Sequence, residues 1–142
     1  MALHLIKLAA GAEGVDELQR RIDRSVAANE KAGRGVIHSH ETRMFPRRGE
    51  ELLDRGSLYW VIKGVVLVRQ RIIGLESRTG TDGARRCAIL LDPEPVPTEA
   101  QPRRAFQGWR YLNAEDAPRD LSSGKGSAPP ALRARLAELG LL

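Results

Sequence analysis

Cysteine is almost absent from this 142-residue chain, in which Cys87 is the only one. A single cysteine excludes an internal disulfide and is typical of a reducing compartment. Long apolar runs are lacking too, since no stretch approaches the roughly 20 residues that span a bilayer. The N-terminal segment also lacks the basic start of a secretory signal. We therefore expect a cytoplasmic protein that does not enter the membrane.

Lysine is scarce, because only 4 of the 23 basic residues are lysines and 19 are arginines. The net charge of +5 arises between Arg34 and Arg110, where 14 basic residues face 9 acidic ones. Arginine presents a planar fork of donors that suits phosphates and stacks on bases. Two interpretations are open: a surface for nucleic acid or phosphate, or an arginine-rich composition with solvated charges.

Apolar spacing predicts the first half of the fold. Residues 2–8 alternate as a strand does, and residues 14–33 carry apolar positions at helical spacing before Gly33, a candidate C-cap. A second strand is expected over 35–45, and a short helix over 46–56 that begins at Pro46. Strands over 57–63, 65–77 and 84–92 follow, with the last two closing as a hairpin through the polar turn Arg-Thr-Gly-Thr-Asp-Gly.

The stretch Gly56–Ile72 is nearly continuous apolar chain that ends in Arg69, Gln70 and Arg71. The apolar part, 58–67, is expected in the core. The Arg-Gln-Arg end is expected at the solvent-exposed rim, where a binding surface would begin.

The second half of the chain is richer in proline and poorer in apolar residues. Four prolines lie within twelve residues from Pro93, which predicts a rigid extended excursion and then a short aromatic segment. Residues 113–130 have the composition of a flexible connector, and a short helix is expected near the end. We therefore expect one α+β domain over 1–121, with 122–142 as connector and appended C-terminal helix. Its sheet is expected to be small, mostly antiparallel and barrel-like.

Arginine clusters and aromatic residues suggest the binding surface. Single-stranded nucleic-acid binders combine cations along the backbone with rings that stack on bases. By strand alternation Arg69 and Arg71 share a face, and the hairpin is expected to bring them near Arg85 or Arg86. The alternative is that the rings pack in the core and the arginines form ion pairs. The candidate nucleic-acid-binding residues are Arg43, Arg47, Arg48, Trp60, Arg69, Arg71, Arg103, Arg104 and Trp109.

Two histidines, His38 and His40, lie on one face of a predicted strand, at a spacing that two metal ligands can use. A zinc site needs a third or fourth ligand, and Glu41 is expected on the opposite face. Cys87 lies within an apolar strand, where a thiol is usually unreactive. We expect no metal and no cofactor; whether the protein is an enzyme is open, and binding without catalysis is the first hypothesis. An enzyme acting on nucleotides or nucleic acid through His38 and His40 is the second hypothesis, and a protein-interaction module is the third.

Several long motifs resemble one bacterial family. They include MALHLIKL, ELLDRGSLYWVIKG, RRCAILLDPE and PRRAFQGWRYL, which occur in the order seen in domain of unknown function family 1489. This resemblance covers roughly residues 1–121, and it implies no activity.

A second, fold-level resemblance is to small PUA-like domains of the ASCH and EVE types. It rests on an early helix, the strand YWVIKG and a proline-rich aromatic return. It implies a reader of RNA or modified bases with an aromatic pocket, although no pocket residue transfers by motif. The sequence thus favours an RNA- or nucleic-acid-binding module whose oligomeric state is open.

Overall fold

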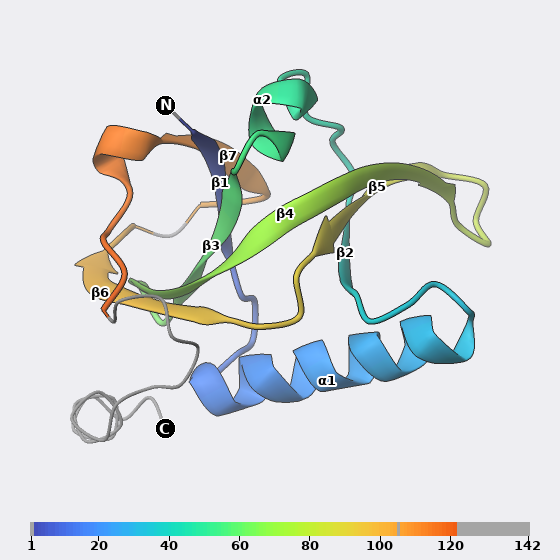
Figure 1. Ribbon diagram of the computed structural model, residues 1–142, viewed down its shortest axis with the longest axis horizontal. Coiled ribbons are helices and arrows are strands. Elements are labelled where there is room, and N and C mark those ends of the chain that lie inside the picture. Colours follow the sequence, from blue (N-terminus) through green and yellow to red (C-terminus); the bar gives the residue numbers. More distant parts are fainter. Residues whose placement is uncertain (1, 105, 122–142) are drawn as a thin grey trace.

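The computed structural model describes residues 2–104 and 106–121, and it shows two α-helices around a mixed seven-stranded sheet (Figure 1). The elements are β1 (Leu3–Leu8), α1 (Val15–Lys31), β2 (His38–Thr42), α2 (Gly49–Leu53), β3 (Ser57–Ile62), β4 (Val65–Thr79), β5 (Arg85–Leu91), β6 (Val96–Pro102), β7 (Trp109–Asn113) and the 3-10 helix η1 (Ala114–Asp116). The α+β class is confirmed.

The sheet is open. Its strands follow the order β2-β5-β4-β3-β1-β7, and β6 pairs with β4 off this path. The pair β1–β3 is parallel, and the other pairs are antiparallel. The expected barrel does not close, because β2 and β7 lie at the two ends of the path and do not pair with each other.

Strand β4 joins the two parts of the sheet. Its first half pairs with β3 and β6, and its second half pairs with β5, which confirms the expected hairpin. Register shifts occur between Val66 and Val68 and between Ile72 and Gly74. Such bulges bend a strand and increase its twist, so one strand can serve both parts of the sheet. The long course of β4 is visible in Figure 1.

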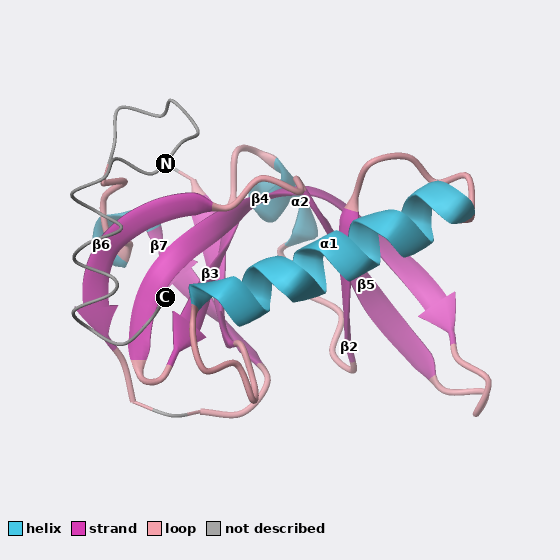
Figure 2. Cartoon of the chain, turned by 90° about the horizontal axis from the view of Figure 1, so that it is seen from below, coloured by secondary structure: helices cyan, strands magenta, loops and turns pink. Residues whose placement is uncertain are grey.

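Helix α1 covers one face of the sheet (Figure 2). Leu18 and Ile22 are its buried apolar residues, one helical turn apart. The helix ends as predicted, because Gly33 has a φ of 76°. The amides of Gly33 and Arg34 then donate to the carbonyl oxygens of Glu30 and Asn29, a Schellman ending. Helix α2 is shorter than predicted and begins at Gly49 rather than Pro46.

The proline-rich segment forms a strand, which the sequence prediction missed. Strand β6 includes Pro97 and Pro102, and β4 is its partner among the strands, while its other edge forms one bridge, from Thr98 to Asp120. Proline cannot donate to a ladder, so it is tolerated on such an edge strand.

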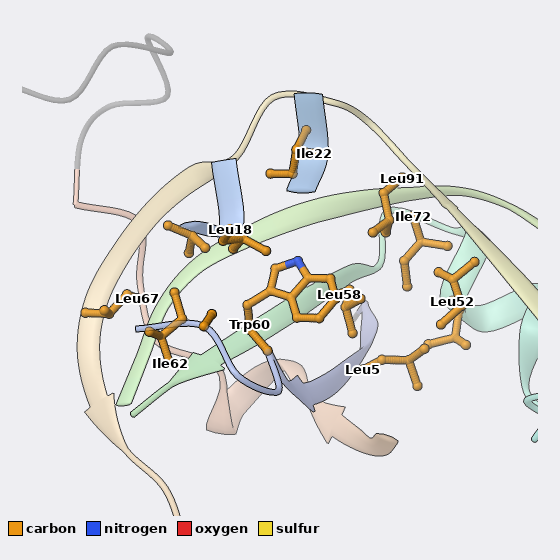
Figure 3. Packing of buried hydrophobic residues seen from close by; sticks show 14 of the residues in the cluster. Leu5, Leu18, Ile22, Leu52, Leu58, Trp60, Ile62, Leu67, Ile72 and Leu91 are labelled. Atoms are coloured by element: carbon orange, nitrogen blue, oxygen red, sulfur yellow. The ribbon is translucent and has the colours of Figure 1, made fainter. Parts of the chain in front are cut away.

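Strand β3 is buried on both faces, since every residue from Ser57 to Ile62 is buried. Successive strand residues point to opposite faces, so β3 contributes to two cores. Leu58, Trp60 and Ile62 join the main core beneath α1 (Figure 3), whereas Tyr59 and Val61 join a smaller core on the other face with Ile6 and Leu112.

The start of the predicted connector is structured. Residues 114–116 form η1, and Asp120 bridges to Thr98 beside β6. The rest of the connector and the C-terminal helix expected within 122–142 lie outside the described residues. Across residues 2–104 and 106–121, no helix is long and apolar enough to cross a membrane.

Candidate functional site

Trp60 forms one wall of a cavity between α1 and the sheet. Its side chain is buried, as the core interpretation predicted, with 3% of its surface exposed. The cavity has a volume of about 260 Å³. We call it the Trp60 cavity; its polar and charged lining comprises Lys7, Arg21, Ser25, His38, Ser39, His40 and the indole of Trp60.

Gln70 orders the polar groups behind this cavity. Its side chain is fully buried, and its amide nitrogen donates to the carbonyl oxygen of Asp92 over 2.9 Å. The amide oxygen lies 2.9 Å from the indole nitrogen of Trp60 and 2.9 Å from Nδ1 of His38. An indole N–H can only donate and a backbone carbonyl can only accept, so these partners fix the orientation of the amide.

The same bonds fix the tautomer of His38. Because the amide oxygen of Gln70 accepts, Nδ1 of His38 carries the proton and Nε2 is an acceptor in the neutral ring. Burial lowers the pKa of His38, and the bond to Gln70 opposes this shift. The ring therefore stays neutral at pH 7 and presents a fixed hydrogen-bonding pattern beside the cavity.

His40 is the second imidazole in the cavity, and its ring meets that of Trp60 edge-on with centroids 5.2 Å apart. Burial, followed by the charges of Lys7, His38 and Arg21, lowers the pKa of His40 to about 4. Its Nε2 atom is buried and has no hydrogen-bond partner among the described residues. A buried polar atom without a partner costs about 1–3 kcal/mol, so such atoms are uncommon in folded proteins.

Two cations border this neutral interior. Lys7 comes from β1 and Arg21 from α1, and burial lowers the pKa of Lys7. The cavity thus combines an aromatic wall, two neutral imidazoles and positive charge at its border. This arrangement suits a flat, polar heterocycle attached to an anion.

A metal site at His38 and His40 would need a third ligand, and the described residues place none beside them. His38 and His40 do share a face, since both contact Trp60, while Glu41 lies on the other face near Arg78. Within residues 2–104 and 106–121 there is no group of three His, Cys, Asp or Glu side chains that could hold a metal. Cys87 is buried, and burial raises the pKa of its thiol, which disfavours the reactive thiolate.

The candidate arginines lie in separate places. Arg43 and Arg47 are exposed in the loop before α2, and Arg48 pairs with Glu51. Arg103 follows β6 and lies beside the tip of the β3–β4 hairpin, where its amide donates to the carbonyl oxygen of Gly64, and Arg104 is exposed next to it. Arg71 lies opposite Ser57 at the other end of that hairpin, about 20 Å away for a six-residue strand.

Arg69 and Arg71 do not lie near Arg85 and Arg86, so that expectation was wrong. Strand β4 extends to Thr79, and its far end pairs with β5, so Arg78 lies opposite Arg86. Arg69 instead makes a two-pronged ion pair with Asp120, over 2.8 and 2.7 Å. The rim interpretation of Arg-Gln-Arg was also wrong for Gln70, which points inward and is fully buried.

Trp109 joins the loop before α2 to β7. Its indole nitrogen donates to the carbonyl oxygen of Met44 over 3.1 Å, and its ring meets Tyr111 edge-on. The hydroxyl of Tyr111 accepts the amide of Arg48. Trp109 is therefore a half-buried structural contact that lies with Arg48. It packs against the main core and lies opposite Lys7 in the β1–β7 register, on the same face of the sheet as Trp60.

Sequence reasoning did not find Lys7, Arg21 or Gln70. Lys7 interrupts an alternating strand and Gln70 lies between two arginines in a β-rich run, which are weak signals of inward-facing polar groups. Arg21 is one of several charges on α1, and only the packing of the helix selects it.

Comparison with known proteins gives one match. The family model described as "Protein of unknown function (DUF1489)" matches residues 5–142. The chain belongs to this family. The match continues to Leu142, so the segment after Leu121, which we expected outside the region shared with the family, lies within it. No curated protein and no solved structure matches the chain.

Proposed function

We propose that this protein binds single-stranded nucleic acid, RNA in particular, and takes one base into the Trp60 cavity. The observation that carries this proposal is the buried Nε2 atom of His40, which lies beside an indole wall without a partner. The edge of a base offers donors and acceptors in one plane, and RNA-binding proteins read such edges on unstacked bases.

The size of the cavity supports a single base. Small-molecule pockets generally exceed about 300 Å³, and the Trp60 cavity measures about 260 Å³. One ring system fits this space, while the attached sugar and phosphate stay outside. The acceptor at Nε2 of His38 and the unpartnered nitrogen of His40 then read the base edge.

In this proposal, positively charged side chains lie close to the phosphate group, which stays outside the cavity when the base is bound. Lys7 and Arg21 are the cations of the lining. The exposed arginines Arg43, Arg47, Arg71 and Arg104 extend the positive field over the surface, and in this proposal they contact phosphates further along the strand. Such contacts make binding weaken as salt rises.

The resemblance to PUA-like domains is part of the proposal. That resemblance implies an aromatic-lined pocket in a small barrel. The sheet of this protein is open, and the indole wall of the Trp60 cavity is the feature that supports the comparison. The proposed location is the cytoplasm, where single-stranded RNA is available and a lone cysteine stays reduced.

The test compares two charge reversals on α1. Arg21 lines the cavity, whereas Arg24 is exposed on the same helix and does not line it. Binding of a fluorescent single-stranded RNA is followed by anisotropy at several salt concentrations. We expect Arg21→Glu to weaken binding about tenfold or more and to lower the salt slope by about one.

Arg24→Glu serves as the matched control, with the same charge change and an expected loss of no more than about threefold. Equal losses in both variants would mean that only overall charge matters and that the cavity is not the site. Absence of RNA binding by the unaltered protein at low salt would refute the proposal outright.

A further inference from the structure

A second hollow lies on the face of the sheet opposite the Trp60 cavity. Its volume is about 370 Å³, and it opens widely to solvent. We call it the Tyr59 hollow. Its functional lining comprises His4, Arg55, Ser57, Tyr59, Arg69 and Arg119, together with Asp120.

His4 presents a donor to this hollow. Its Nδ1 atom accepts the backbone N–H of Ser57 over 2.9 Å, so the proton of the neutral ring is on Nε2. Burial and then the charge of Arg69 lower the pKa of His4. The ring is therefore neutral at pH 7, and its tautomer is fixed by a backbone bond.

Tyr59 presents a second neutral donor. Its ring meets His4 edge-on with centroids 5.0 Å apart. Burial raises the pKa of its hydroxyl, although the charge of Arg69 opposes this shift and that of Asp120 adds to it. The hydroxyl thus keeps its proton at neutral pH and can donate it in a hydrogen bond.

The charges around the hollow are mainly positive. Arg69 and Asp120 neutralise each other through their two-pronged pair, and Arg69 also donates to Ser57 over 3.0 Å. Arg55 and Arg119 are exposed. Arg55 is 3.8 Å from Asp54, and both side chains are about four-fifths exposed to water, so this contact holds Arg55 only weakly.

The backbone of Arg55 is in an unfavourable conformation for arginine. It follows the C-cap of α2 with a φ of 65°, in the left-handed region where glycine is strongly preferred. An arginine at such a position keeps a strained backbone, and strain of this kind is concentrated at functional sites. A role for the Arg55 guanidinium in the hollow would explain why arginine, and not glycine, stands at this position.

We propose that the Tyr59 hollow binds a phosphate group, with His4 and Tyr59 as neutral donors and Arg55 and Arg119 as charged donors. Arginine forks match the oxygens of phosphate, and charge-assisted hydrogen bonds are the stronger class. The site does not depend on the proposed nucleic-acid function, because Tyr59 and Trp60 point to opposite faces of the sheet.

The first experiment titrates the full chain with inorganic phosphate by calorimetry, at constant ionic strength, and repeats the titration with acetate. We expect saturable binding of phosphate and at least tenfold weaker binding of acetate. Tyr59→Phe keeps the ring and removes the hydroxyl, and Arg119→Ala removes one guanidinium group. Each is expected to weaken phosphate binding about tenfold, as loss of a hydrogen bond to a charged group does.

Arg24→Ala is the matched control, because Arg24 is an exposed arginine on α1 and does not line the hollow. It is expected to bind phosphate within about twofold of the unaltered protein. No saturable phosphate binding, equal binding of acetate, or equal losses in Arg24→Ala and Arg119→Ala would each overturn the site.

Arg55→Gly separates the binding role from a structural role. Glycine relieves the left-handed backbone, so the variant is expected to melt at a higher temperature without phosphate. It is also expected to bind phosphate several-fold more weakly. A variant that is more stable and binds phosphate normally would show that Arg55 has no part in the site.

The source of the phosphate is distinguished by competition. A short RNA with a 5′-phosphate is compared with the same RNA ending in a 5′-hydroxyl, each against inorganic phosphate. Competition by the phosphorylated RNA alone assigns the hollow to a nucleic-acid end. Phosphate binding without competition by either RNA assigns it to a small phosphate compound.

Discussion

Tyr59 and Trp60 are neighbours on β3, yet they border hollows of different character. The Trp60 cavity lies beneath α1, and its imidazoles are neutral, with His38 buried and His40 half-buried. The Tyr59 hollow is open, and arginines dominate its border. One strand with both faces covered can therefore supply two sites, because each residue step reverses the direction of the side chain.

The two hollows differ mainly in how far they are open to solvent. Burial of the imidazoles in the Trp60 cavity favours their neutral forms, so specificity there depends on the shape and the hydrogen bonds of a ligand. The Tyr59 hollow keeps its water, so charges persist at its border and an anion can be attracted from solution. Changes in the more buried Trp60 cavity should therefore affect stability more than equal changes in the open Tyr59 hollow.

The largest expected effect concerns Gln70. Gln70→Leu leaves the indole N–H of Trp60, Nδ1–H of His38 and the carbonyl of Asp92 without their partner, and we expect a loss of about 3 kcal/mol or more in unfolding free energy. The unfolding free energy is measured by urea denaturation, with circular dichroism as the signal. Gln107→Leu, at an exposed position, should leave the midpoint unchanged. A small effect at Gln70 would mean that the cavity is not a fixed polar framework.

The next effect is a loss of stability in acid. The pKa of His40 is about 4 in the folded protein against 6.5 in the unfolded chain, so the unfolded state binds more protons between these values. Stability should therefore fall as pH drops below about 6.5, by about 2 kcal/mol from this residue between pH 7 and pH 5. The pKa values of His4 and His38 are also lowered and add in the same direction.

Urea unfolding at pH 7 and pH 5 checks this expectation. His40→Gln removes the titrating group, so the variant should lose less stability between the two pH values than the unaltered protein does. An unchanged difference in the variant would show that His40 is not the buried neutral imidazole described above.

A smaller effect is expected at the open hollow. Asp120→Asn breaks the two-pronged pair with the half-buried Arg69 and should cost about 1–2 kcal/mol of unfolding free energy. Asp82→Asn is the matched control, since Asp82 pairs with Arg86 in an exposed turn, and its effect should be smaller. Equal effects would mean that residues 114–121 add little to the stability of the hollow.

The local sequence pattern was sufficient to predict much of the fold. The spacing of Leu18 and Ile22, the glycine at position 33 and the turn after Thr79 are local signals, and the helix and hairpin form where they indicate. Strand β6 escaped prediction because its prolines argue against a strand unless its edge position is known. Barrel closure depends on bulges and register, which local pattern does not specify.

The candidate sites were less predictable. Trp60 was identified from its rarity and its setting, but its partners Gln70 and Arg21 come from other elements, and only their packing selects them. Asp120 was assigned to a flexible connector by composition, yet its ion pair with Arg69 orders part of that segment. Tyr59 and His4 gave no signal beyond an apolar strand, since a donor role depends on the backbone bond that fixes His4.

The most direct test of the account observes the two indole N–H groups, of Trp60 and Trp109, by ¹⁵N–¹H NMR during titration with single-stranded RNA. The expected result is a large shift of the Trp60 resonance with saturation, together with little change at Trp109, whose indole is bonded to Met44. RNA binding that shifts Trp109 and leaves Trp60 unchanged would contradict the account, because the base would then lie outside the Trp60 cavity.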